Sequence, residues 1–483
     1  MNDTSMLIGG KLRPASDGSV LDALNPATGN RLGTIPDATA ADVDDAVAAA
    51  SSAFATWRRS TPGERSALLT TLADVVAQHA DELARLDADD NGSLYREMRR
   101  DVDMAVFYLR YYAGLTLQLH GDTVPSEPGT LTYSVRRPYG VVGRLIPFNH
   151  PLMFAASKIA APLAAGNTVV IKPSEHTSLS ALRLGELAAD VVPPGVLNVV
   201  TGTGARSGDA LVAHPDVRRL AFTGSAATGR AIQRRAAEVS IKTVTLELGG
   251  KNPLVVFPDA DLDVAVAAAV RGMNFTWQGQ SCGSLSRVVV HRDVHDAFVE
   301  RLAARVGALR PGLPDDPDAD TGAIVNAGQL EKVLSYVRLG QDEGARLCTG
   351  GDRVTDGGLA DGLFVRPAVF ADVDPGSRLA QEEIFGPVLA VMRPFADAEE
   401  ALRIANATSL GLTASVFTRD LGTAHRFAED LEAGYVWVNE VGRHVPGTPF
   451  GGVKDSGIGR EEDLDELFSY TQLKNVHINY GHL

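Results

Sequence analysis

Gly140-Val141-Val142-Gly143-Arg144-Leu145-Ile146 is the stretch that decides the fold of this chain. The run is short and largely apolar, and a proline-containing loop follows it, which predicts a buried strand. Residues 152–165 and 178–192 have helical periodicity, and residues 167–172 and 196–200 are predicted as two further strands. The order strand, helix, strand, helix, strand is typical of a doubly wound parallel sheet, which binds nucleotides beyond its strand ends.

The same alternation continues outward from this unit. Residues 40–88 are rich in alanine, with apolar residues three or four apart, and Thr61-Pro62-Gly63-Glu64 is a helix start signal within them. A second α/β stretch extends from about residue 253 to 450. Residues 130–136 and 469–480 alternate β-branched or aromatic residues with polar ones, so we expect exposed strands that pair across a subunit interface.

The composition is that of a globular protein without nucleic-acid or membrane partners. Lys and Arg total 45 and Asp and Glu total 60, so the net charge is 45 − 60 = −15, which disfavours anionic partners. The 483 residues suggest two or three domains, and no apolar run reaches the length of ~18 residues that a membrane span needs. Only Cys282 and Cys348 are present and the first residues do not resemble a secretory signal, so we expect a cytoplasmic location.

Three motifs carry residues suited to catalysis. Cys282 lies in the polar loop Gln278-Gly279-Gln280-Ser281-Cys282-Gly283 and is either a nucleophile or a structural thiol. Glu247, between two leucines at a strand end, would become a general base if buried, or it forms a salt bridge with Lys251. Asn149, at a strand-to-helix junction, either donates a hydrogen bond to a developing oxyanion or caps the helix. Cys348 keeps the role of a small structural residue.

Three further motifs suggest a nucleotide site. Gly202–Gly208 is similar to a dinucleotide fingerprint, with the third glycine one place late. Phe222–Gly229 combines a strand, a Gly/Ser turn and a helix start, where free N–H groups bind phosphate. An ordinary tight turn is the alternative for both. Lys172 and Glu175 follow another strand, and they either bind a ribose or cap the next helix.

In their order and spacing these motifs, with Glu382–Pro387 and Pro449–Gly452, resemble the aldehyde dehydrogenase superfamily of the NAD(P)-dependent, hydrolytic type. The resemblance extends from about residue 7 to 478. It implies an α/β fold with a Rossmann-like nucleotide-binding domain, an α/β catalytic domain and a small β oligomerisation element, and a homodimer or homotetramer. The ranges expected for these three parts are, in that order, residues 1–119 with 139–250, residues 251–450, and residues 120–138 with 466–483.

The resemblance also implies a role for each catalytic residue. Cys282 would attack an aldehyde to form a thiohemiacetal, with the Asn149 side chain and the Cys282 backbone N–H as the oxyanion hole. Loss of a hydride to NAD would leave a thioester, and Glu247 would activate the water that hydrolyses it to a carboxylic acid. Lys158 would relay protons to and from Glu247. Because Glu247 is present, acyl transfer to coenzyme A or phosphate is the less favoured alternative, and a non-catalytic binding protein is the other.

The cofactor is expected to be NAD, with NADP less favoured, because the Glu175 carboxylate would repel a 2′-phosphate. Lys172 and Glu175 would bind the adenosine ribose, and Glu383 the nicotinamide ribose. Ser225 with Gly224 would contact the pyrophosphate. No metal site is expected. The full set of expected cofactor-binding residues is Ile146, Phe148, Lys172, Glu175, Gly204, Gly224, Ser225, Leu248, Glu383 and Phe385.

Departures from the family pattern bear on the substrate. Ser157 stands where a tryptophan is usual, which suggests room for a bulky aldehyde, and the aromatic cage needed for a quaternary ammonium group is not evident. Residues 441–445 match the segment that closes the substrate tunnel in this family. Arg443 in that segment, with His150 and His444, would attract a carboxylate, so a carboxylated semialdehyde is expected beside a bulky or aromatic aldehyde. Exposure of Arg443 to solvent or to an interface is the alternative. The expected substrate residues are His150, Ser157, Trp277, Arg443 and His444.

Overall fold

The first of two large sheets contains the strands predicted around Gly140–Ile146. The computed structural model describes residues 4–481, so the outermost residues of the expected ranges 1–119 and 466–483 lie outside the description. Eight strands are ordered β2-β1-β9-β8-β7-β10-β11-β21, and the five from β9 to β11 are mutually parallel. Their bounds are β1 Met6–Ile8, β2 Lys11–Arg13, β7 Val141–Leu145, β8 Thr168–Lys172, β9 Leu197–Val199, β10 Val217–Thr223, β11 Thr243–Glu247 and β21 Gly457–Ile458.

The helices of this half also follow the prediction. Residues 40–88 fall into three helices, of which α1 and α2 each begin with a reciprocal capping box at Thr39 and Thr61. Helix α6 ends before the predicted Val192, because the residue before a proline disfavours the α conformation. The bounds are α1 Ala40–Trp57, α2 Pro62–Gln78, α3 Ala80–Asn91, α4 Tyr95–Gly114, α5 Pro151–Ala164, α6 Leu179–Ala188, α7 Asp209–Ala213 and α8 Ala226–Val239.

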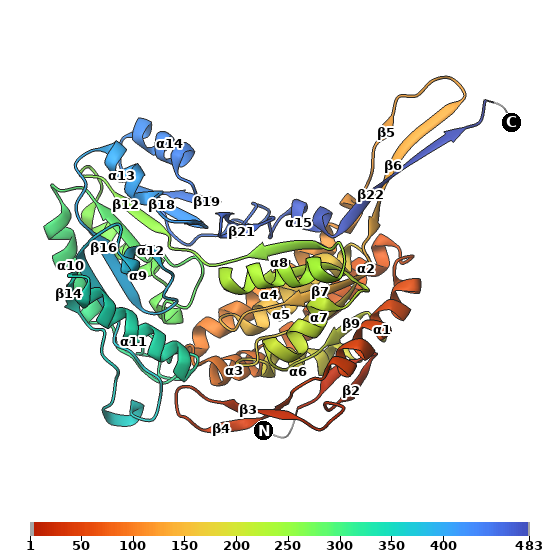
Figure 1. The fold of residues 1–483 in the computed structure, drawn as a ribbon, viewed down its shortest axis with the longest axis horizontal. Helices are drawn as coiled ribbons and strands as arrows, with labels where there is room; N and C mark the ends of the chain where they lie inside the picture. The colour runs from red at the N-terminus through yellow and green to blue at the C-terminus, as the bar shows by residue number, and fades with distance from the viewer. Residues whose placement is uncertain (1–3, 482–483) are drawn as a thin grey trace.

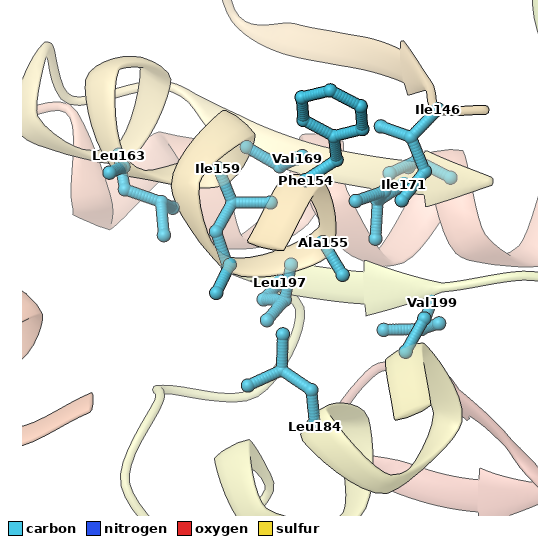
Figure 2. Close-up of a cluster of buried hydrophobic side chains, with 14 of the residues drawn as sticks. Ile146, Phe154, Ala155, Ile159, Leu163, Val169, Ile171, Leu184, Leu197 and Val199 are labelled. Atoms are coloured by element: carbon cyan, nitrogen blue, oxygen red, sulfur yellow. The ribbon is translucent and has the colours of Figure 1, made fainter. Parts of the chain in front are cut away.

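The core of this half lies between the central strands and the helices that cross them. Strands β7 and β8 are buried along their whole length, which explains why they are nearly continuous apolar runs. Figure 2 shows apolar side chains from α5, α6, β8 and β9 gathered in one cluster. The labelled members are Ile146, Phe154, Ala155, Ile159, Leu163, Val169, Ile171, Leu184, Leu197 and Val199.

The second large sheet has seven strands in the order β14-β15-β16-β13-β12-β18-β19, and only the β14–β15 pair is antiparallel. Strands and helices alternate through this part of the chain, as expected for an α/β stretch from about residue 253 to 450. The strand bounds are β12 Pro253–Val256, β13 Arg287–Val290, β14 Arg346–Thr349, β15 Ala368–Val373, β16 Val388–Met392, β18 Thr413–Phe417 and β19 Tyr435–Val438. The helix bounds are α9 Leu262–Gly272, α10 His295–Gly307, α11 Ala327–Asp342, α12 Arg378–Gln381, α13 Ala398–Ala405 and α14 Leu421–Asp430.

A three-stranded arm projects from the body of the molecule (Figure 1). Strand β6 (Thr130–Pro138) pairs along nine residues with β22 (Thr471–Asn479), and β5 (Thr123–Val124) completes the sheet. The two alternating segments are therefore strands, as predicted, and they pair with each other; pairing with a second subunit stays a prediction. The remaining elements are β3 Val20–Leu24, β4 Arg31–Pro36, β17 Leu410–Gly411, β20 Val453–Lys454 and α15 Leu464–Ser469. None of the helices within residues 4–481 is both long and apolar enough to cross a membrane.

Asn167, fully buried before β8, holds three separate segments together. Its amide donates to the carbonyls of Pro162 (3.2 Å) and Tyr470 (2.9 Å), and its oxygen accepts from the Gly140 N–H (3.2 Å). We predict that Asn167→Ala lowers the free energy of unfolding by about 2–4 kcal/mol, because three buried polar groups lose their partner. Denaturant unfolding measures the loss. The control, Asn30→Ala at an exposed asparagine, should change stability by less than about 0.5 kcal/mol.

Candidate active site

The predicted catalytic motifs converge on one pocket of about 140 Å³. Strands β7, β10 and β11 reach it with their carboxyl ends, the position at which doubly wound sheets bind ligands. Helix α11 and the loops around Cys282 and Glu383 supply the opposite wall. The lining residues are Pro147, Phe148, Asn149, Phe154, Thr223, Gly224, Ser225, Glu247, Leu248, Gly249, Cys282, Gln329, Lys332, Glu383 and Phe385.

Cys282 lies in a fixed loop, as its flanking residues predict. The Asn252 side chain donates to the carbonyls of Cys282 (2.7 Å) and Ser284 (2.9 Å), which holds the loop on β12. Gly279 has a φ of +66°, and a Cβ there would lie 2.4 Å from the Gly386 carbonyl oxygen, so only glycine fits. Burial raises the pKa of the Cys282 thiol to about 12, with the Glu383 and Glu247 carboxylates acting in the same direction. The thiolate therefore needs a compensating positive charge to form.

Asn149 does not cap helix α5. In its first turn the Leu152 N–H donates to Asp87 (3.0 Å), and within residues 4–481 the Asn149 Oδ1 atom has no hydrogen-bond partner. The capping alternative is therefore wrong, and the amide lines the same pocket as Cys282. Asn91, at the end of α3, donates to the Asn149 backbone carbonyl (3.3 Å) and holds this turn in place. Nothing in the sequence motifs pointed to Asn91, because the contact joins residues 58 positions apart.

Glu247 is a buried carboxyl without a hydrogen-bond partner on either oxygen within residues 4–481. Burial and the nearby Glu461 charge raise its pKa well above the ordinary value. The alternative of a salt bridge with Lys251 is wrong, since the Lys251 ammonium also lacks a partner in the described chain. Burial and neighbouring Arg287 lower the pKa of Lys251 to about 7. Gly451 must lack a side chain, because a Cβ would lie 2.8 Å from the Glu247 carboxylate.

Lys158 contacts Glu461 rather than Glu247. The Glu461 carboxylate accepts from the Lys158 ammonium (2.5 Å) and from the Arg144 guanidinium (2.5 Å), and all three groups are buried. Burial opposes the ionised carboxylate, but Arg144 and Lys158 outweigh it and lower the pKa of Glu461 to about 2. Lys158 therefore acts on Glu247 only through its positive charge, which opposes the rise in the Glu247 pKa. The sequence analysis missed Glu461, whose only signal was a pair of glutamates near the end of the family pattern.

The expected adenosine-side residues lie together at the ends of β8 and β9. Lys172 and Glu175 are 3.7 Å apart, and the Gly204 N–H donates to Glu175 at 3.4 Å. Glu175 does not cap α6, because the first N–H of that helix, at Leu179, donates to Asp90 (3.0 Å), so the capping alternative is wrong. Ile146 is buried beneath this region. Gly204 itself opens a short π-helical turn, Gly204–Gly208, rather than an α-helix.

The other expected cofactor residues line the pocket. Ser225 caps α8 by accepting from the Thr228 N–H (3.2 Å), which places it and Gly224 at a helix N-terminus. Glu383 accepts from the Gly250 N–H (2.9 Å). Burial raises the pKa of Glu383. Phe148, Leu248 and Phe385 also line the pocket. The rings of Phe148 and Phe385 meet edge to face, with their centroids 5.5 Å apart.

Helix α11 contributes two residues that the sequence analysis missed. Gln329 donates from one amide to the carbonyls of Ile384 (2.9 Å) and Phe385 (2.8 Å), so it fixes the loop that carries Glu383. Lys332 also lines the pocket, and its charge acts to lower the Glu383 pKa against the effect of burial. Polar residues on an amphipathic helix give no motif, so this contribution needed the structure.

The expected substrate residues lie outside the lining of this pocket. His150 contacts Asp101 through Nδ1 (2.7 Å), and its ring packs 5.4 Å from Phe154 and 5.5 Å from Trp277. Ser157 is buried inside α5. The Arg443 side chain is exposed, and its backbone carbonyl accepts from Trp437. His444 bonds Glu462 (3.0 Å). The structure therefore groups His150 with Trp277 and shows no ion pair that joins Arg443 to them.

Comparison with known proteins agrees with this arrangement. A model of the aldehyde dehydrogenase family matches residues 13–476. Aldehyde dehydrogenase TropH of Talaromyces stipitatus is 46% identical over 479 residues, which cover 98% of this chain and 92% of that protein. Two solved structures in complex with NAD+ each cover 99% of this chain. The aldehyde dehydrogenase from Bacillus cereus has 41% identity, a TM-score of 0.95 and 96% of its own chain covered. Betaine aldehyde dehydrogenase from Staphylococcus aureus has 35% identity, a TM-score of 0.97 and 95% of its own chain covered. The chain belongs to the aldehyde dehydrogenase family.

Proposed function

We propose that this protein oxidises an aldehyde to a carboxylic acid with NAD, through a thioester on Cys282. One observation carries the proposal: Cys282, Asn149 and Glu247 line one pocket, and both Glu247 oxygens are free of hydrogen bonds from the described chain. A buried, unpaired carboxyl of raised pKa is suited to general base work. The NAD complexes of similar enzymes support the choice of cofactor.

The residues on the cofactor side fit a dinucleotide. The N-terminus of α8 at Ser225 offers N–H groups to a pyrophosphate, and the Glu383 and Glu175 carboxylates are suited to ribose hydroxyls. Gly249 must lack a side chain, since a Cβ would lie 2.1 Å from the Glu383 carboxylate. The carboxylate of Glu175 disfavours a 2′-phosphate, so we assign NAD before NADP. Bound NAD supplies a hydride acceptor.

The chain's own residues perform the remaining steps. The Cys282 thiol loses its proton to water and its sulfur attacks the aldehyde carbon, while the Asn149 amide and the Cys282 N–H donate to the oxygen that becomes negative. After the oxidation, Glu247 takes a proton from water, and the resulting hydroxide attacks the thioester carbon. The carbon–sulfur bond then breaks, which releases the acid and restores Cys282. The ion pair of Lys158 and Glu461 stays charged while Glu247 gains and loses its proton, and both charges act on the Glu247 pKa.

The same proposal extends to substrate, assembly and location. The aromatic group of His150, Phe154 and Trp277 favours a bulky or aromatic aldehyde, and exposed Arg443 favours a carboxylated one. We assign a homodimer or homotetramer, with the arm made from residues 120–138 and 466–483 at the interface. Both cysteines are free, which suits a cytoplasmic enzyme. Residues 1–119 with 139–250 would bind the cofactor, and residues 251–450 carry Cys282.

We predict that Cys282→Ser abolishes aldehyde-dependent NADH formation, because a hydroxyl at this position is a far weaker nucleophile than a thiolate. The loss should exceed about 10³-fold. Absorbance at the NADH band measures it, and fluorescence titration should show that NAD still binds. Cys348→Ser, at the other free cysteine, is the matched control and should keep full activity. NADH formation by Cys282→Ser at the wild-type rate would refute the proposed mechanism.

We predict that Glu247→Gln retains a burst of NADH and then turns over about 10²–10⁴-fold more slowly, because only thioester hydrolysis needs the base. The wild-type kcat should rise with pH through the raised pKa of Glu247, since the base works in its ionised form. Stopped-flow absorbance separates burst from turnover. Product analysis with and without coenzyme A is the second readout. An acyl-coenzyme A product, or normal turnover by Glu247→Gln, would reject hydrolysis through Glu247.

We predict that Arg443→Ala lowers kcat/KM for a carboxylated aldehyde by about tenfold and leaves that for an uncharged aldehyde of similar size unchanged. The reason is the loss of one cation at the expected tunnel mouth of an otherwise acidic protein. Steady-state kinetics with both substrates measures the ratio. Arg59→Ala, at another exposed arginine, is the control. Equal losses on the two aldehydes would show that Arg443 does not select for charge.

A further inference from the structure

Glu462 follows the buried Glu461 directly and has an unusual backbone. Its φ is +71°, in the left-handed region that non-glycine residues rarely adopt. Such a conformation persists only where the surrounding contacts enforce it, and it is common at functional sites. Here it turns successive side chains apart, so that Glu461 meets Arg144 and Lys158 while Glu462 meets a different set of partners.

The partners of Glu462 come from two distant segments. Its carboxylate accepts from Nδ1 of His444 (3.0 Å), and its backbone N–H donates to Glu466 (2.8 Å). The Tyr108 phenol of α4 faces the same carboxylate. Burial opposes ionisation of Glu462, but the His444 bond and neighbouring charges outweigh it and hold its pKa below the ordinary value. An ionised, largely buried carboxylate thus holds His444 in place.

His444 belongs to residues 441–445, which by the family resemblance match the segment that closes the substrate tunnel. Its ring packs 4.7 Å from Phe450 and stacks at 5.9 Å on Tyr435. Phe450 in turn exchanges both backbone hydrogen bonds with Glu461, at 2.9 and 2.8 Å. The Glu461–Glu462 dipeptide therefore holds this region at two points. The Glu462 side chain bonds His444, and the Glu461 backbone bonds Phe450.

We infer that Glu462 is a positioning residue, which couples the position of the substrate loop 441–445 to the Lys158–Glu461–Arg144 cluster and thereby to thioester hydrolysis. The inference rests on the proposed function, since it assigns Glu462 a role in the deacylation step only. A movement of His444 displaces Glu462, and with it the neighbouring Glu461. The negative charge of Glu461 raises the pKa of Glu247. An aldehyde seated under the loop thus favours the arrangement in which Glu247 works.

The test compares Glu462→Gln, His444→Gln and the double variant with wild type. Each single change should raise the KM for aldehyde and lower kcat about three- to tenfold, because one charge-assisted hydrogen bond is lost. The amplitude of the NADH burst should stay at the wild-type level, because acylation does not use this contact. The double variant should be no worse than the poorer single one, as expected for two partners in one interaction. Asp465→Asn, an exposed carboxylate on the same segment, should leave all values within twofold of wild type.

Each other outcome overturns the inference. Wild-type kcat and KM in His444→Gln, fully additive losses in the double variant, or equal losses from Asp465→Asn would each show that Glu462 has no positioning role. A burst that falls in parallel with turnover would show a general structural role instead. If Glu462→Gln does not fold, His444→Gln decides alone, because His444 lies on a surface loop. Absence of aldehyde-dependent NADH formation in the wild type would reject the proposed function itself, a result distinct from wild-type kinetics in the variants.

Discussion

The Glu461 carboxylate, shared between Arg144 in β7 and Lys158 in α5, is the contact on which the active-site arrangement depends. Two cations inside a sheet–helix core are tolerable only with a carboxylate between them, since a single unpaired buried charge is strongly destabilising. Arg144 also contacts Tyr470, whose ring lies under Arg219 at 4.7 Å. The segment that follows the second sheet is thereby fixed on the first sheet, with Glu461 beside Glu247.

The same low-polarity environment affects both reacting groups. It raises the pKa of the Cys282 thiol and of the Glu247 carboxyl, because burial opposes the charged form of each group. Neither group is therefore strongly reactive until a ligand changes the local charge. Glu461 stays ionised in the same region because it has two cationic partners. Neighbouring carboxyl groups thus have pKa values shifted in opposite directions, lowered at Glu461 by its two cationic partners and raised at Glu247 by burial, which separates a structural role from a catalytic one.

Local patterns were enough to predict the β7-α5-β8-α6-β9 unit, because buried parallel strands and amphipathic helices have distinct periodicities. Motif order was enough to bring Cys282, Asn149 and Glu247 together. It was not enough to decide between a base and a salt bridge for Glu247, because spacing along the chain does not show which way a side chain points. The partner of Lys158 lay 303 residues away in the sequence, and the Asn91 contact also needed three-dimensional structure.

The separation of Arg144 from Glu461 by 317 residues has a consequence for biosynthesis. A ribosome makes β7, α5 and nearly all of both sheets before it reaches the carboxylate that neutralises their buried cations. Until then, Arg144 and Lys158 lack the carboxylate that they share in the finished protein, and burial of an unpaired charge is costly. Strand β22, which completes the arm, follows Glu461 closely. Completion of the arm and closure of the catalytic pocket are thus late and nearly simultaneous events, so a nascent chain holds neither a finished arm nor a working pocket.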